Sequence, residues 1–279
     1  MTLPKVSVIT CTFGRFSCVE RVIKQIYDQD YTGEWEHIIY NTCVEHPLVL
    51  DSSLVGKNVF VINNNVDFQT HAKYTNVGSI RRDSLLFATG DYCCIADDDD
   101  AYLKHYIRQG VDGMLRHPTT KAFKPKYSLF ETDHKLEQAQ NSLEASVIID
   151  MPILRSIGYK EGNGDENLSW YTELGWSGRM VENDEYTIPS YVYRWVSNDG
   201  AKHRQSGNMG DPDNFVNHKL SENDYGDRAL TLQKENSTQI YYDYFKSNID
   251  GRTSTPDITP TFPVNWHPDL IDKYVRQYL

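Results

Sequence analysis

Apolar runs and amphipathic stretches alternate through the first 117 residues of the chain. Four short runs, rich in β-branched and other apolar residues, predict strands at 6–9, 37–40, 59–62 and 92–96. Between them, apolar residues recur at helical spacing and predict helices at 17–26, 76–88 and 103–114. Ser17 and Glu20 have the spacing of a capping box, which predicts that the first helix begins there.

The regular alternation of strands and helices predicts an α/β fold with an open, mostly parallel sheet. The run 92–96 is apolar throughout, as expected for a strand that is covered on both faces. In such sheets ligands bind beyond the carboxyl ends of the strands. Two loops are placed there by the pattern, 10–15 after the first strand and 97–100 after the fourth.

After residue 117 the pattern changes to an α+β character with longer loops. It predicts strands at 122–130, 146–150 and 191–196 and helices at 151–157 and 166–174. Residues 251–268 contain four prolines among Thr and Ser and predict an extended linker, followed by a short helix at 270–278 that we expect to pack back on the domain. We therefore divide the chain into 1–117, 118–206 and a C-terminal extension, 207–279.

The composition is that of a globular, acidic protein. The chain has 279 residues, 39% of them hydrophobic, and a formal net charge of −11. This charge argues against long-range attraction to bare nucleic acid or to an anionic membrane surface. No stretch approaches the ~20 apolar residues of a membrane helix, and we expect neither a membrane segment nor a secretory signal. Five cysteines without paired spacing predict reduced thiols and a cytoplasmic protein.

Four consecutive aspartates, Asp97–Asp100, follow the buried fourth strand. Like charges this close are electrostatically expensive unless a cation lies among them, and carboxylate oxygens suit Mg²⁺ or Mn²⁺. If the chain stays extended, Asp97 and Asp99 project to the same side. The alternative is a solvated acidic loop that favours the dipole of the helix expected to start near Leu103.

Several short motifs, in this order and spacing, resemble those of the GT-A-fold, family-2-type glycosyltransferases over residues 5–205. The segment 6–15, VSVITCTFGR, resembles the family's opening VSVIIPTYNR. The segments 76–92, NVGSIRRDSLLFATGDY, and 95–100, IADDDD, resemble its later N.G...ARN and LDxDD motifs. The resemblance implies a GT-A-type, Rossmann-like sheet flanked by helices. Residues 1–117 would form its nucleotide-sugar-binding half and 118–206 its acceptor-side half.

The resemblance also implies a nucleoside-diphosphate sugar donor, which we expect to be a UDP-sugar, and a divalent cation, Mn²⁺ or Mg²⁺. Asp99 would bind the cation on the diphosphate, and Asp97 would contact ribose or sugar. Asp100 would be a further ligand or cap the next helix. The remaining donor-binding candidates are Thr12, Phe13, Arg15, Asn41, Arg81, Arg82 and Asp98, with one of the two adjacent arginines facing the donor.

Asn41 marks a departure from the family pattern. The family often has two aspartates after its second strand, the first of which accepts from the uracil N3–H. This chain has Asn41-Thr42 at the matching positions. An amide carbonyl can still accept that hydrogen bond.

Glycosyl transfer needs a stabilised leaving diphosphate and a base for the acceptor hydroxyl. By the resemblance, the base opens a helix after the acceptor loop, where this chain has Asp165 and Glu166, and we favour Asp165 slightly. Acidic residues at an ordinary helix N-terminus are the alternative interpretation. His203 is the candidate third metal ligand. The resemblance also implies inversion of the anomeric centre by direct displacement.

The acceptor is open at this point. By the resemblance it is a glycan or a lipid-linked sugar, while a protein, a small metabolite or a modified nucleic-acid base stays an alternative. Trp170, Trp176 and Trp195 could stack on sugar faces, although core packing is the commoner role of tryptophan.

Other functions fit the same motifs less well. The main alternative is a non-catalytic nucleotide-sugar or carbohydrate-binding module on a transferase-like fold. A nucleotidylyltransferase would have a Gly-rich loop and a lysine after the first strand, and a haloacid-dehalogenase phosphatase would have its aspartates there. The loop 10–15, TCTFGR, has neither pattern.

Overall fold

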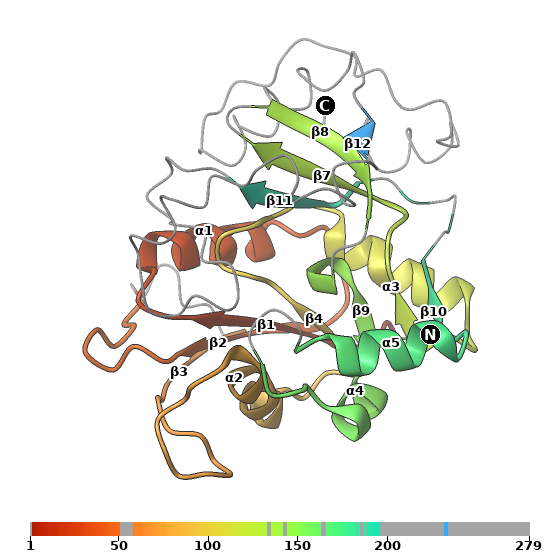
Figure 1. Cartoon of the computed structure of the whole chain (residues 1–279). Helices are drawn as coiled ribbons and strands as arrows, with labels where there is room; N and C mark the ends of the chain where they lie inside the picture. The colour runs from red at the N-terminus through yellow and green to blue at the C-terminus, as the bar shows by residue number, and fades with distance from the viewer. Residues whose placement is uncertain are drawn as a thin grey trace.

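The computed structural model describes residues 2–50, 58–132, 135–141, 144–162, 166–182, 184, 187, 189–195 and 232–233. A seven-stranded sheet lies at its centre (Figure 1). Its strands are β1 (Val6–Thr12), β2 (Trp35–Asn41), β3 (Val59–Asn63), β4 (Tyr92–Ile95), β6 (Ala122–Phe123), β9 (Ile148–Asp150) and β10 (Met180–Val181). They are arranged in the order β10-β6-β9-β4-β1-β2-β3.

The sheet is mostly parallel, as predicted. β3, β2, β1 and β4 run parallel to one another, and β9 is inserted antiparallel between β4 and β6. The chain moves from β1 to β2 and β3 on one side and then returns to β4 on the other side of β1. This is a topological switch point, and it brings the carboxyl ends of β1 and β4 side by side.

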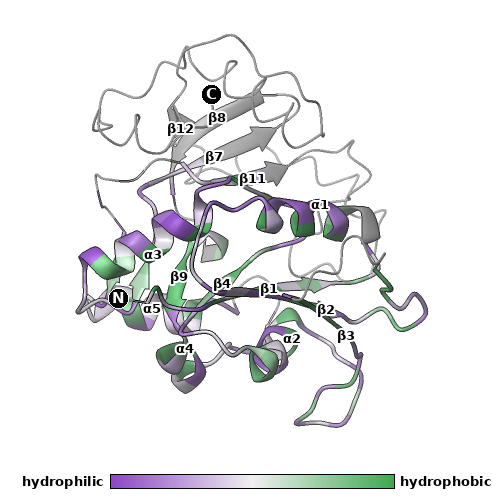
Figure 2. Cartoon of the chain, turned by 180° about the vertical axis from the view of Figure 1, so that it is seen from behind, coloured by the Kyte–Doolittle hydropathy of each residue, from purple (hydrophilic) through white to green (hydrophobic). Residues whose placement is uncertain are grey.

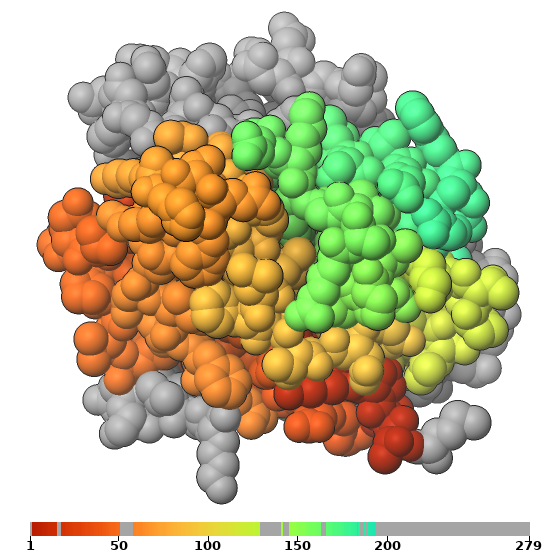
Figure 3. All heavy atoms as spheres, turned by 90° about the horizontal axis from the view of Figure 1, so that it is seen from below, coloured from red at the N-terminus to blue at the C-terminus, as the bar shows by residue number. Residues whose placement is uncertain are grey.

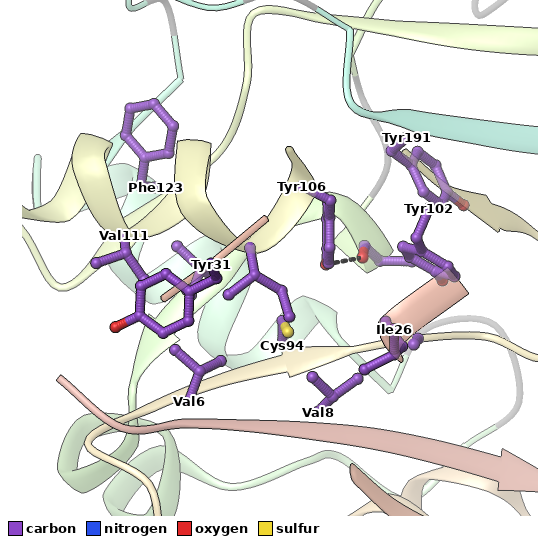
Figure 4. Close-up of a cluster of buried hydrophobic side chains, with 14 of the residues drawn as sticks. Val6, Val8, Ile26, Tyr31, Cys94, Tyr102, Tyr106, Val111, Phe123 and Tyr191 are labelled. Carbon is purple, nitrogen blue, oxygen red and sulfur yellow. Dashed lines mark hydrogen bonds between the residues drawn. The ribbon is translucent and has the colours of Figure 1, made fainter. Parts of the chain in front are cut away.

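Helices cover both faces of the sheet. They are α1 (Phe16–Tyr27), α2 (Val77–Ser84), α3 (Tyr106–Arg116), α4 (Met151–Ile157) and α5 (Leu168–Trp176), with short 3₁₀ turns η1 (Leu85–Phe87) and η2 (Glu144–Ser146). α1 and α3 lie on one face, and α2, α4 and α5 on the other (Figures 1 and 2). Because strand side chains alternate, Cys94 packs under α3 whereas Cys93 and Ile95 face the opposite layer. Figure 4 shows the first of these layers, where Val8 of β1 lies beside Ile26 of α1 and Val6 lies beneath Tyr31.

A second, smaller sheet begins where the aspartate run ends. Its strands are β5 (Ala101–Tyr102), β7 (Tyr127–Thr132), β8 (Lys135–Gln140), β11 (Tyr191–Trp195) and β12 (Leu232–Gln233), in the order β12-β8-β7-β11-β5. β5 pairs antiparallel with β11, so the segment after Asp100 is held by a strand from far along the chain.

The predicted elements of the first 117 residues are confirmed with shifted ends. α1 begins at Phe16, and its N-cap residue is Arg15, so the predicted capping box is wrong. The helix expected from 103 begins at Tyr106 because residues 101–102 form β5. The expected strand 122–130 is split by Pro125, which lacks an N–H, into β6 and β7 of different sheets.

Four strands, β5, β8, β10 and β12, were not predicted. The linker at 251–268 and the terminal helix at 270–278 lie outside the described residues. In the part of the chain that is described, every helix is too short or too polar to traverse a lipid bilayer.

His37 on β2 makes the fold sensitive to pH. Its side chain is fully buried with Nε2 2.8 Å from Thr10 Oγ1, and burial lowers its pKa to about 3. An unfolded histidine titrates near 6.5, so below this pH the unfolded chain binds a proton that the folded chain does not. Protonation of the unfolded chain therefore lowers the free energy of unfolding progressively as the pH falls from 6.5 toward 3. Above pH 6.5 the imidazole is neutral in both states and has no such effect.

We expect His37→Gln to remove part of the pH dependence, which amounts to at most about 1.4 kcal/mol for each pH unit. The measurement is the free energy of unfolding in urea at intervals from pH 7 to pH 4. His46→Gln is the matched control, because His46 is exposed. Equal slopes for wild type and His37→Gln would contradict the assignment of a neutral buried imidazole.

Candidate functional site

The loop after β1 and the turn after β4 are joined by a network of charged groups. Thr12 Oγ1 donates to Asp98 Oδ2 at 2.6 Å. Arg15 donates to Asp98 through Nε, at 3.0 Å, and through Nη2, and to Asp99 Oδ2 through Nη1 at 2.8 Å. Arg21 on α1 donates to the backbone carbonyls of Asp98 and Asp99 at 3.2 and 3.0 Å. The carboxyl ends of β1 and β4 therefore meet through this network, and except for Arg21 its residues are ones that the sequence predicted to lie at this edge.

Asp98 is 1% exposed and Asp99 is 7% exposed. Burial raises the pKa of Asp98 to about 7, with Arg15 opposing the shift and Asp99 adding to it. Burial alone would lower the pKa of Arg15, but the two carboxylates raise it above its ordinary value. The guanidinium of Arg15 therefore stays charged and balances this pair of acids.

The aspartate run forms a turn. The Asp100 N–H donates to the Asp97 carbonyl at 3.4 Å, and the Asp97 N–H donates to the Tyr102 hydroxyl at 2.6 Å. The run is therefore not extended, so the condition under which Asp97 and Asp99 would project to the same side is not met, because the chain reverses here to form β5. The Tyr191 hydroxyl donates to the Asp100 carboxylate, and the N-cap residue of α3 is His105, so Asp100 does not cap that helix.

Arg81 on α2 links the turn to the second half of the chain. Its Nη2 donates to Asp97 Oδ1 at 2.7 Å, and its Nη1 donates to Glu166 Oε1 at 2.7 Å and to Asn167 Oδ1 at 3.0 Å. Burial raises the pKa of Asp97, Arg81 opposes this shift, and the charges of Asp99 and Glu166 add to it. Burial would lower the pKa of Arg81, but Asp97 and Glu166 raise it.

Arg82 lies away from this network. Its guanidinium contacts Asp67 at 2.9 Å and Asp83 at 2.8 Å. Of the two adjacent arginines, Arg81 is the one that faces the aspartate turn, because consecutive residues of a helix point about 100° apart.

Asn41 and Gly14 shape the loop after β1. Asn41 is fully buried, and its Oδ1 accepts from the N–H groups of Gly14 at 3.3 Å and Cys43 at 3.1 Å. A carbonyl oxygen has two lone pairs, so this acceptor is fully used within the protein. Gly14 has φ +69°, a conformation that side chains disfavour. Base recognition by Asn41 stays a prediction; in this structure its amide braces the loop that carries Phe13, which is 39% exposed.

The structure brings most of the predicted donor-side residues together and leaves two predicted residues outside the description. Asp165 and His203 lie outside the described residues. Glu166 is buried against Arg81, and Trp170 is packed in the core. The sequence did not single out several residues that contact the aspartate turn or Arg81, because nothing local marks them: Arg21, Tyr102, Asn167 and Tyr191.

The aspartate turn has the right chemistry for Mg²⁺ or Mn²⁺. The described residues contain no group of three or more His, Cys, Asp or Glu side chains arranged around one point. Such ions commonly use one or two carboxylates and complete their shell with water and substrate phosphates. Asp99 fits that role, provided that Arg15, which contacts its Oδ2, shares or yields this oxygen.

No family model matches the sequence, and no curated protein sequence matches it either. Solved structures do match. Staphylococcus aureus TarS 1–349, in complex with UDP-GlcNAc, is 15% identical with a TM-score of 0.51, over 89% of this chain and 72% of its own. A longer structure of S. aureus TarS is 15% identical with a TM-score of 0.50, over 89% of this chain and 43% of its own. The chain therefore spans less than half of that protein.

A third match is more distant. The mannosyltransferase PcManGT from Pyrobaculum calidifontis, in complex with GDP-Man and Mn²⁺, is 16% identical with a TM-score of 0.48, over 69% of this chain and 56% of its own. The two TarS structures show that the fold is of the GT-A glycosyltransferase type, as predicted.

We expect Arg15→Leu to lower the free energy of unfolding by roughly 3 kcal/mol at pH 8, because it leaves Asp98 buried without its cation. The loss is smaller at pH 5, because the raised pKa of Asp98 favours its neutral form as the pH falls. Urea unfolding at the two pH values measures both effects. Arg179→Leu is the control, since its pair with Glu173 is exposed and contributes less than about 1 kcal/mol. Equal losses in the two variants would contradict the buried pairing.

Proposed function

We propose that the protein is a glycosyltransferase that moves a sugar from a nucleoside-diphosphate donor, a UDP-sugar, to an acceptor hydroxyl. The observation that carries the proposal is the meeting of Arg15, Arg81 and the turn Asp97–Asp100 at the switch point of a GT-A-type sheet. Ligands of open α/β sheets bind at this edge. S. aureus TarS, which shares the fold, is known in complex with UDP-GlcNAc.

The donor would lie over the aspartate turn. In this proposal Asp99 holds Mn²⁺ or Mg²⁺, with His203 as a candidate further ligand. When bound, the cation supplies positive charge to the leaving diphosphate. Thr12 and the exposed Phe13 line the nucleotide pocket, and Arg81 orients Asp97 toward ribose or sugar.

Asp165 is the proposed base. It would accept the proton of the acceptor hydroxyl as the hydroxyl oxygen attacks the anomeric carbon. The bond from that carbon to the diphosphate oxygen breaks in the same step, which inverts the configuration. The resemblance supports this assignment, as does the position of Asp165 directly before Glu166, which reaches the aspartate turn through Arg81.

The acceptor we propose is a glycan or a lipid-linked sugar, as in the family that the sequence resembles. Acceptor sites are formed by loops that differ among proteins of one fold.

The five cysteines form no disulfide, which supports a reducing compartment such as the cytosol.

A non-catalytic nucleotide-sugar-binding module is the second candidate. The feature that favours it is the guanidinium of Arg15, which contacts Asp98 and Asp99 where a transferase would place its cation. A transferase should slowly hydrolyse its donor in the presence of Mn²⁺ without an acceptor, whereas a binding module should not. A panel of nucleotide sugars, assayed for released nucleoside diphosphate, separates the two candidates.

We expect Asp99→Asn to abolish Mn²⁺-dependent donor binding, because the neutral amide is a poor ligand for a divalent cation. Calorimetry measures this loss, with and without Mn²⁺, using the intact nucleotide sugar that the protein hydrolyses in the panel assay. Glu173→Gln on the exposed face of α5 should bind as wild type does. Undiminished Mn²⁺-dependent affinity in Asp99→Asn would remove Asp99 from the metal site.

Asp165→Asn should retain donor affinity within about twofold and lose at least ~100-fold in turnover, the usual contribution of a general base. Steady-state rates with an identified acceptor, together with calorimetry on the same preparation, provide the measurement. Full turnover in Asp165→Asn would show that the base lies elsewhere.

A further inference from the structure

Glu166 is buried against the guanidinium of Arg81. The residue is 2% exposed, and its Oε1 lies 2.7 Å from Arg81 Nη1. Arg81 is itself buried and holds Asp97 with its other terminal nitrogen at 2.7 Å. A general base must reach the hydroxyl that it deprotonates. The placement of Glu166 suits it instead to hold Arg81.

Gly162, four residues before Glu166, is also held at the start of α2 by its backbone N–H and carbonyl. The Gly78 N–H donates to the Gly162 carbonyl at 3.1 Å, and the Gly162 N–H donates to Asn76 Oδ1 at 3.3 Å. A Cβ at Gly78 would lie 1.9 Å from the Lys160 carbonyl oxygen, so only glycine permits this approach. The segments around α2 and α4 lie side by side on the face shown in Figure 3.

The two sides of the segment 163–165 are therefore both anchored. Gly162 is anchored to α2 by its backbone, and Glu166 is anchored to the same helix by its side chain. The Lys160 N–H also donates to the Glu166 carbonyl at 3.1 Å, which ties the two sides to each other. The residue proposed as base, Asp165, belongs to this segment.

We propose that Glu166 is a positioning residue that fixes Arg81 on Asp97 and, through the same ion pair, fixes the chain next to Asp165. The inference rests on the proposed function, since it assigns Asp97 to the donor side and Asp165 to the acceptor side. The buried guanidinium of Arg81 then contacts the donor side through Asp97 and the acceptor side through Glu166. Removing the charge of Glu166 loosens Arg81 and so weakens donor binding, although Glu166 lies on the far side of Arg81 from Asp97.

The test compares Glu166→Gln with Glu161→Gln. The first variant keeps the shape of the side chain and removes its charge, and the second is a control on an exposed neighbour whose side chain is 65% exposed. Calorimetry with UDP and Mn²⁺ should show affinity about tenfold weaker in Glu166→Gln and unchanged in Glu161→Gln. The pH profile of kcat/KM should keep its acidic limb in both variants, because that limb belongs to the base.

Two results would overturn the inference. If Glu166 is the base, Glu166→Gln binds UDP as wild type does but loses the acidic limb and at least ~100-fold in kcat. If Glu166 is only structural, Glu166→Gln unfolds more readily while its UDP affinity and pH profile stay those of wild type.

A measurement without ligand separates this inference from the proposed function. Both ends of the Arg81 guanidinium are hydrogen-bonded, so its Nη groups should give separate nitrogen NMR signals that merge in Glu166→Gln and persist in Glu161→Gln. If wild type fails to bind UDP, the proposed donor is wrong, and the NMR result alone decides the positioning role. Unchanged Arg81 signals in Glu166→Gln would overturn it.

Discussion

Carboxylates buried at the end of β4 have to be balanced by cations, and three arginines from three segments surround them. Arg15 comes from the loop after β1, Arg21 from α1 and Arg81 from α2. Uncompensated buried charge costs several kcal/mol, so each of these segments gains stability by staying close to the aspartate turn. The same charges that suit the turn to a phosphate-bound cation therefore also help to hold the surrounding elements in place.

Much of the central sheet could be predicted because its signals are local. The apolar runs of β1 to β4 and the helical spacing of α1 to α3 can be detected within a window of a dozen residues. The second sheet could not be predicted in this way. β8 has the sequence KLEQAQ, which lacks the β-branched and aromatic residues typical of strands, and it is defined by its pairing with β7.

The candidate site shows the same division. The aspartate run and loop 10–15 are contiguous motifs, and their meeting follows from the parallel order of β1 and β4. The partner of Arg81 could not be inferred, because Glu166 is separated from it by 85 residues. Asp165 and Glu166 are also nearly equivalent in sequence. Only the three-dimensional contact shows that Glu166 pairs with Arg81.

The position of β9 has a consequence for synthesis on the ribosome. This strand, Ile148–Asp150, is inserted between β4 and β6, although it is made more than fifty residues after β4. Until it emerges from the exit tunnel, the nascent chain carries β4 as an open, apolar edge beside the completed β1. Such an edge is a template for pairing with other chains. β4, whose carboxyl end leads into the aspartate turn, is therefore paired along both of its edges only late in translation.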